Sequence, residues 1–265
     1  MTDDAVHYDV TDGVATVTLD QPERRNALSA AISTGIREAL DRIEDEGDAR
    51  CVVFEGAGEA FSAGGDIGLM RERLDSDVPL DERVRELERS TSETMARVAT
   101  FPLPTVAKID GPAVGAGANL AIACDVQLAS ERAAVGFVFR QVGLTVDAGT
   151  SYLLPRLVGE NVAKELVFTG EVVDAERALE LGLVNHVYPD GEFEERVNEF
   201  VERVASGPTV ALRHAKRLLG EGLEKPLERA MVDEATAQGI VFQTADHEEG
   251  VTAFLDGRQP EFTGR

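Results

Sequence analysis

Near the middle of the chain the sequence reads Gly111-Pro112-Ala113-Val114-Gly115-Ala116-Gly117-Ala118-Asn119-Leu120, directly after the apolar segment Thr105-Val106-Ala107-Lys108-Ile109. The apolar segment has the composition of a β-strand. The small residues after it predict a turn that opens a helix at Gly115, where free N–H groups and the positive end of a dipole point at one spot. That arrangement suits a phosphate or an oxyanion. Close packing of the helix is the alternative explanation.

Before this segment, strands and helices alternate. Residues 8–11 and 14–19 flank Asp12-Gly13, which predicts a β-hairpin with a primed turn. Ser29 predicts the N-cap of an amphipathic helix that ends near Glu46. Residues 51–54 then predict a strand buried on both faces.

After it, residues 126–128 and 135–139 predict short strands, and from about Gly149 the pattern is mainly helical. Strands that alternate with helices and then give way to helices alone predict an α/β core with a helical C-terminal region. We place the core at residues 1–200 and the helical region at residues 201–265.

The composition of the 265 residues restricts the partners. Lys and Arg number 26 and Asp and Glu 49, a formal net charge of −23. A surface this acidic repels nucleic acid and suits an anionic membrane poorly. We therefore expect neither as a partner. Because the acidic residues are spread along the whole chain, we also expect a halophilic protein, adapted to salt that screens their repulsion.

The N-terminus, the apolar runs and the cysteines indicate the cellular compartment. Residues 1–4 lack the basic start of a signal peptide, and no apolar run is long enough to span a bilayer, which predicts a cytoplasmic protein. Cys51 and Cys124 lie in apolar surroundings, which predicts buried free thiols rather than a disulfide.

The sequence lacks the motifs of several other kinds of site. A dinucleotide fingerprint would need glycine where Leu120 stands. The four histidines are scattered without metal-ligand spacing or an evident carboxylate partner, so we expect no metal site. The sequence also contains no Gly-x-Ser-x-Gly motif of a hydrolase.

Three further segments have the composition of a ligand site. Ala60-Phe61-Ser62-Ala63-Gly64-Gly65-Asp66-Ile67 would let a ligand approach the backbone, with Asp66 capping a helix, although a plain strand-to-helix turn explains it equally. In Gly143-Leu144-Thr145-Val146-Asp147-Ala148-Gly149-Thr150, Asp147 is either a helix cap or a catalytic acid. Pro22-Glu23-Arg24-Arg25-Asn26-Ala27-Leu28 places two arginines in a very acidic chain, which suits a polyanionic ligand.

In these four segments the sequence resembles the crotonase family, the enoyl-CoA hydratase/isomerase superfamily. The similarity continues through residues 169–175, 182–185 and 208–212 and so covers almost the whole chain. The resemblance implies a crotonase-like spiral of ββα units with a C-terminal helical trimerisation region, as a homotrimer or hexamer. It also implies an acyl-CoA substrate and no bound cofactor, since coenzyme A is part of the substrate.

The resemblance further implies which residues form the site. It assigns the backbone N–H groups of Ala63 and Ala116 to an oxyanion hole for the thioester carbonyl, where losing one donor typically costs ~3 kcal/mol. The residues that it implies for binding coenzyme A and the acyl group are Arg25, Ala27, Gly64, Asp66, Ile67, Gly115 and Phe139.

Two departures from the family pattern bear on the reaction. Asn119 and Phe139 stand where the resemblance places the two glutamates of hydratases, and neither side chain can move a proton. Asp147 matches the acid of isomerase-like members, notably the ring-epoxide isomerases of phenylacetate degradation. One carboxylate suffices for a 1,3-proton shift, and apolar residues 137–139 would raise its pKa toward the working pH.

We therefore predict an isomerase that acts on an enoyl-CoA or a ring-epoxide acyl-CoA, with Asp147 as the proton carrier. An enoyl-CoA hydratase of fatty-acid β-oxidation remains an alternative, and so does a non-catalytic acyl-CoA-binding subunit. Gly257 and Gln259 stand where family members often carry lysines, so that only Arg258 is left there to contact coenzyme A phosphates.

Overall fold

The N-terminal hairpin begins the main sheet. The structure is a computed structural model that describes residues 5–74 and 77–265. Residues 75–76 and residues 1–4, on which the signal-peptide argument rests, lie outside the described residues. Strands β1 (Val6–Thr11) and β2 (Val14–Leu19) pair antiparallel. Asp12 and Gly13 between them have φ of 51° and 78°, the left-handed pair that a primed turn requires, so the predicted hairpin is confirmed.

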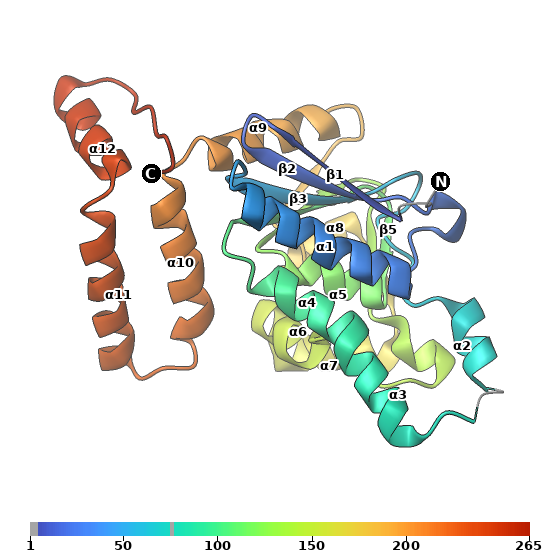
Figure 1. Cartoon of the computed structure of the whole chain (residues 1–265). Helices are drawn as coiled ribbons and strands as arrows, with labels where there is room; N and C mark the ends of the chain where they lie inside the picture. Colours follow the sequence, from blue (N-terminus) through green and yellow to red (C-terminus); the bar gives the residue numbers. More distant parts are fainter. Residues whose placement is uncertain (1–4, 75–76) are drawn as a thin grey trace.

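Two sheets organise the core (Figure 1). The larger has the order β1-β2-β3-β4-β6-β9 and is parallel from β2 onward, and the smaller has the order β5-β7-β8. The remaining strands are β3 (Cys51–Gly56), β4 (Thr105–Ile109), β5 (Pro112–Val114), β6 (Val126–Ser130), β7 (Ala134–Gly136), β8 (Val172–Asp174) and β9 (His186–Tyr188).

Helices cover both faces of the larger sheet, as its parallel strands require. Strand β3 shows this, since Val52 and Phe54 pack in the core with α1 (Ala30–Glu46), α4 (Glu93–Ala99) and α5 (Ala116–Ala123), whereas Cys51 and Val53 pack with α9 (Phe193–Ala205). The strand is therefore buried on both faces, as predicted. The Ser29 hydroxyl accepts from the Ile32 N–H at 3.3 Å, which confirms the predicted N-cap of α1.

The remaining helices connect and extend this core. They are η1 (Pro22–Arg24), α2 (Ile67–Leu74), α3 (Leu80–Leu87), the π-helix η2 (Glu88–Ser92), η3 (Val138–Val142), α6 (Thr150–Val158), α7 (Glu160–Thr169) and α8 (Ala175–Leu181).

Two strand predictions need correction. The strand expected at residues 135–139 runs instead from Ala134 to Gly136, where its pairing with β5 and β8 stops, and η3 follows. The region after Gly149 contains β8 and β9, which the sequence analysis missed. Strands of three residues show too little alternation to be recognised, and only their pairing with β7 and β6 defines them.

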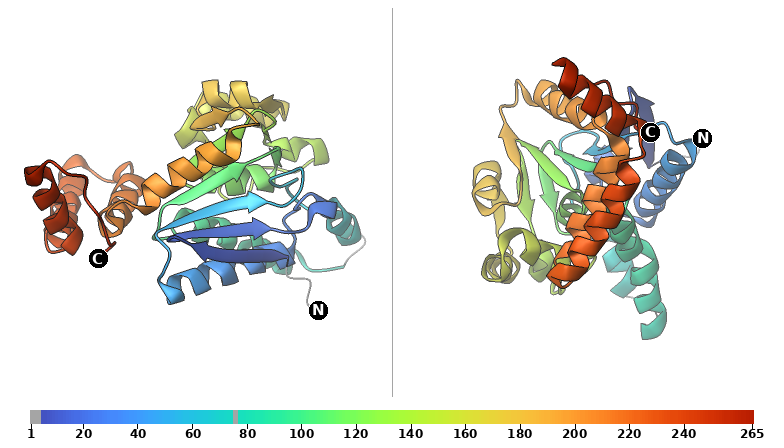
Figure 2. Two further views of the ribbon diagram at one scale, coloured as in Figure 1. Left: turned by 90° about the horizontal axis from the view of Figure 1, so that it is seen from above. Right: turned by 90° about the vertical axis from the view of Figure 1, so that its left-hand side faces the viewer.

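The C-terminal helices form an arm that extends away from the core (Figures 1 and 2). It consists of α10 (Thr209–Gly222), α11 (Leu227–Val241) and α12 (Ala245–Asp256). The predicted boundary between residues 200 and 201 lies inside α9, whose Val201 and Ala205 are buried against the sheet. The arm leaves the core after this helix, at Gly207. The large apolar residues exposed on the arm include Leu219, Leu223, Leu227, Met231, Phe254 and Leu255.

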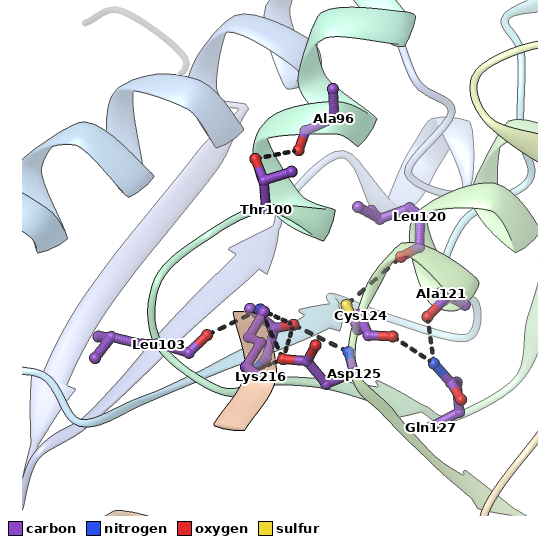
Figure 3. Close-up of polar contacts among 10 residues, drawn as sticks. Ala96, Thr100, Leu103, Leu120, Ala121, Cys124, Asp125, Gln127 and Lys216 are labelled. Atoms are coloured by element: carbon purple, nitrogen blue, oxygen red, sulfur yellow. Dashed lines mark hydrogen bonds and ion pairs between the residues drawn. The ribbon is translucent and has the colours of Figure 1, made fainter. Parts of the chain in front are cut away.

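Lys216 fastens the first helix of the arm to the core (Figure 3). Its Nζ lies 2.7 Å from Asp125 Oδ2 and donates to the Leu103 carbonyl at 3.0 Å. Asp125 in turn accepts from the Thr105 N–H at 2.7 Å. Because the Lys216 side chain is only 12% exposed, this network holds α10 in a fixed position.

Both cysteines are buried and free, as predicted. Burial raises the pKa of the Cys51 thiol to about 12 and also raises that of Cys124, so both thiols stay protonated and unreactive. Across residues 5–74 and 77–265, no helix is long and apolar enough to cross a membrane.

Candidate active site

Two loops meet at the start of α5. Gly64 has a φ of 84°, and a Cβ at this position would lie 2.4 Å from the Val114 oxygen and 3.2 Å from the Ala116 nitrogen. A Cβ at Gly117 would lie 2.4 Å from the Ser62 oxygen. Glycine at both positions therefore allows the loop after β3 to touch the loop before α5.

These loops leave two N–H groups free. Ala116 is the first residue of α5, and its N–H has no acceptor among the described residues. The same holds for the N–H of Gly65, and both residues line one cavity. Two free backbone donors beside a cavity, with the positive end of a helix dipole, form an arrangement that stabilises an oxyanion.

The prediction that Ala63 supplies a donor is wrong. Its N–H donates to the Arg25 carbonyl at 2.8 Å and so is already engaged. Gly65, two residues later, offers the free group instead. The sequence could not distinguish these positions, because the acceptor belongs to a distant loop that only the fold brings alongside.

The cavity has a volume of about 390 Å³ and lies between these loops, the start of α1, η2 and η3. Most of the predicted site residues line it: Ala63, Asp66, Ile67, Gly115, Ala116, Phe139 and Asp147. The predicted residues Arg25, Ala27 and Gly64 belong to the adjoining loops and do not line it.

Asp66 shapes one side of the cavity. Its Oδ1 accepts from the Leu69 N–H at 3.1 Å, which confirms the predicted cap of α2. Its Oδ2 lies 3.0 Å from Arg24 Nη1, so one of the two arginines expected to meet a polyanion is paired with a carboxylate.

Asp147 reaches the cavity from the loop before α6. The N-cap of α6 is Gly149, and no side chain caps this helix, so the helix-cap explanation of Asp147 is excluded. The carboxylate has no hydrogen bond or ion pair within the part of the chain that the structure describes. Although Asp147 is exposed to solvent in the single chain, the surrounding protein desolvates its carboxyl group and raises its pKa.

The backbone around Asp147 is held in an unusual conformation. Ala148 and Gly149 have φ of 47° and 88°, which turns the chain sharply before the helix. The Asp147 carbonyl accepts from the Thr150 N–H at 2.9 Å and from the Asn119 amide at 3.1 Å. These two hydrogen bonds fix the backbone of the loop that carries the Asp147 carboxylate.

Asn119 is fully buried and does not line the cavity. Its Oδ1 accepts from the Thr150 hydroxyl at 2.6 Å, and its amide donates to Asp147. Phe139 does line the cavity and is 7% exposed. The two positions at which the resemblance implies hydratase glutamates therefore hold a structural amide and an apolar wall.

Other candidate groups are engaged elsewhere. Arg258 donates to both carboxylate oxygens of Glu249 at 2.6 and 2.8 Å, and this pairing lowers the pKa of Glu249 to about 2. His7 lies 3.0 Å from Asp20, a carboxylate partner that the sequence analysis did not foresee. A metal site would need at least three His, Cys, Asp or Glu side chains close together. The residues that the structure describes contain no such group.

Proteins of known family that are similar to this chain identify its family. The family model described as enoyl-CoA hydratase/isomerase matches residues 9–265. The chain is 39% identical, over 98% of both chains, to a Rhodobacter capsulatus protein named "Probable enoyl-CoA hydratase". It is 32% identical, over 97% of both, to the 1,2-epoxyphenylacetyl-CoA isomerase of Escherichia coli. The crystal structure of an enoyl-CoA hydratase from Bacillus anthracis superimposes with a TM-score of 0.90 at 34% identity, covering 98% of this chain and all of that one.

The chain belongs to the enoyl-CoA hydratase/isomerase family and has the crotonase fold, in which ββα units precede C-terminal helices. It is an acyl-CoA enzyme of that family.

Proposed function

We propose that the protein isomerises an enoyl-CoA or a ring-epoxide acyl-CoA, with Asp147 as the group that moves the proton. One observation carries this proposal: Asp147 is a carboxylate on the cavity lining that has no charged or hydrogen-bonding partner among the described residues, and desolvation raises its pKa. A carboxylate in this state is a stronger base than an ordinary aspartate, and its protonated form returns the proton readily.

For a 3-enoyl-CoA the reaction takes two steps. The Asp147 carboxylate removes a proton from C2, and the electron pair moves onto the thioester oxygen to form a dienolate. The N–H groups of Gly65 and Ala116 stabilise that oxygen. The carboxylic acid then returns the proton to C4, which yields the conjugated 2-enoyl-CoA. Asp147 ends in its starting state, and no bound cofactor is needed.

Hydration is the second candidate, because several relatives carry hydratase names. The residues of the cavity argue against it. Hydration needs one group to activate water and one to deliver a proton, whereas Asn119 is bound to Asp147 and Thr150, and Phe139 is apolar. Two other carboxylates line the cavity. Asp66 is committed to Arg24 and to the Leu69 N–H, and Glu86 has an interaction partner of its own.

The proposal includes a homotrimer or a dimer of trimers. In the single chain, Leu219, Leu223 and Leu227 are each more than 70% exposed, on an arm that has few contacts with its own core. Apolar surface of this extent is typical of an interface. We place the protein in the cytoplasm, at an ionic strength that screens its charge of −23.

Two assays on one preparation test the reaction. A 3-enoyl-CoA should gain the absorbance of a conjugated enoyl thioester, and crotonyl-CoA should keep it. Asp147→Asn should remove the first activity and still bind the thioester. Loss of crotonyl-CoA absorbance at a comparable rate would favour the hydratase. Thioester binding without turnover of aliphatic or ring-epoxide substrates would favour a non-catalytic binding subunit.

A further inference from the structure

One part of the cavity lining is rich in hydroxyl groups. Four residues of the lining carry hydroxyl groups, and we call them the hydroxyl wall: Ser29 at the N-cap of α1, Ser33 in α1, and Ser90 and Thr91 in η2. Helices α1 and α4 lie alongside each other, with η2 leading into α4 (Figure 1). An acyl pocket for plain hydrocarbon has no need of such a wall.

Ser33 is the most informative member. It is 2% exposed and lines the cavity, yet its hydroxyl makes no hydrogen bond with any described residue. Buried hydroxyl groups in helices usually donate to the carbonyl four residues earlier. Thr94, in the adjoining helix, does so to Ser90 at 2.9 Å. The Ser33 hydroxyl therefore remains available to a group inside the cavity.

The other hydroxyl groups lie close to Ser33. The Thr94 hydroxyl bridges the carbonyls of Ser33 at 3.2 Å and Ser90 at 2.9 Å, which joins α1 to η2 at this level. Arg37 Nη1 donates to the Arg89 carbonyl at 2.6 Å and holds the wide π-turn in place. The side chains of Ser90 and Thr91 have no hydrogen-bond partner among the described residues. π-turns often occur at functional sites.

The wall extends away from the reacting centre. The Leu28 N–H donates to the Gly64 carbonyl at 2.6 Å, so Ser29 begins α1 next to the loop that carries Gly65. Ser33 lies four residues further, roughly 6 Å along the helix axis. An acyl chain whose thioester is bound at Gly65 and Ala116 would reach Ser33 with carbons beyond those that react.

We infer that the acyl group of the substrate carries an uncharged oxygen, as a hydroxyl or a carbonyl, that hydrogen-bonds to the hydroxyl wall at Ser33. This inference rests on the proposed thioester site. A hydrocarbon chain would displace water from these hydroxyl groups and leave them unpaired, which disfavours it. None of the described residues that line the cavity carries a positive charge, which disfavours an acyl group that ends in a carboxylate.

Binding of unreactive thioesters tests the inference without depending on turnover. The dissociation constants of octanoyl-CoA and of 5-, 6-, 7- and 8-hydroxyoctanoyl-CoA are measured by calorimetry on the full chain. At least one hydroxylated ligand should bind about two- to tenfold more tightly than octanoyl-CoA, the ratio expected for one hydrogen bond. Ser33→Ala should remove that preference without weakening octanoyl-CoA binding, because it also removes the hydroxyl that a hydrocarbon chain leaves unpaired. Thr34→Ala, an exposed hydroxyl on the same helix, should keep the preference.

The outcomes separate this inference from the proposed function. Octanoyl-CoA that binds as tightly as all four hydroxylated ligands would overturn the inference alone. A preference that survives in Ser33→Ala would also overturn it, because another group would then bind the oxygen. Failure of all five thioesters to bind would overturn the proposed function itself.

Discussion

The side-chain amide of Asn119 donates a hydrogen bond to the main-chain carbonyl of Asp147, with 3.1 Å between Nδ2 and O. The same side chain accepts from the Thr150 hydroxyl at 2.6 Å. Asn119 therefore acts on the loop that carries the proposed base rather than on the substrate. A residue in this position orients the carboxylate without contacting the reacting atoms.

Replacing Asn119 should affect stability and turnover together. Asn119→Ala removes two buried hydrogen bonds, so we expect it to lower the free energy of unfolding by about 1–3 kcal/mol. It should lower kcat more than it weakens thioester binding, because the carboxylate loses its orientation and the oxyanion donors remain. Urea unfolding, kcat and the dissociation constant of octanoyl-CoA are the measurements.

Asn185→Ala is the matched control, since its Oδ1 accepts from the Gln127 N–H at 2.8 Å and it does not line the cavity. It should lower stability with kcat unchanged. An equal loss of kcat in both variants would show that Asn119 has no specific role in positioning Asp147.

The pH dependence of activity should report the raised pKa of Asp147. Below that pKa the carboxyl group is protonated and cannot remove a proton, so kcat/KM should rise with pH through a value above that of an ordinary aspartate. Asp147→Glu should retain an acidic limb, whereas Asp147→Asn should have almost no activity at any pH. An acidic limb of the kcat/KM profile with its midpoint at or below the pKa of an ordinary aspartate would contradict desolvation of this carboxyl group.

The same shift has a consequence for stability. A carboxyl group with a raised pKa in the folded state binds its proton more tightly there than in the unfolded chain. Its unfavourable contribution to the free energy of unfolding therefore develops as the pH rises through the pKa of the unfolded state. The contribution is complete above the pKa of the folded state. At neutral pH, Asp147→Asn should be at least as stable as the wild type in urea.

One of the proposed oxyanion donors can be removed by a single substitution. Ala116→Pro deletes the N–H at the first position of α5, where proline is compatible with a helix. We expect kcat to fall by roughly 10²–10³, the usual cost of one such donor. Ala116→Gly keeps the N–H and should retain most of the activity. Near-normal turnover in a well-folded Ala116→Pro would exclude this donor.

Association through the C-terminal arm should hide its apolar residues. Sedimentation equilibrium should give three or six times the mass of one chain. The double substitution Leu223→Lys and Leu227→Lys should shift the protein toward monomers, because burying two charges at an interface is costly. Leu74→Lys, at an 83% exposed position outside the arm, should leave the mass unchanged. A monomeric wild type would refute the proposed assembly.

Added salt should stabilise the protein. With a net charge of −23, self-repulsion opposes the compact state, and KCl screens it. The free energy of unfolding in urea should therefore rise with KCl toward molar concentrations, and most steeply at the lowest salt. Sucrose at equal osmolarity, which does not screen charge, is the control. No gain up to molar KCl would contradict the expected adaptation to salt.

The sequence by itself determined the parts of the molecule that depend on local patterns. The primed turn at Asp12-Gly13, the cap at Ser29 and the buried strand β3 follow from residues close together in the chain, and the structure confirms each. The order of the motifs along the chain was also sufficient to recognise the family, because each motif preserves a local backbone shape.

Only the tertiary structure decided which groups of the site are free to act. Ala63 and Gly65 are both small residues in one loop, and the Arg25 carbonyl alone makes the first N–H unavailable. Asp147 could have been a helix cap until the fold placed Gly149 there and turned Asn119 toward its carbonyl. Hydrogen-bond pairing and burial depend on partners distant in the sequence, and the position of those partners is a property of the packed chain.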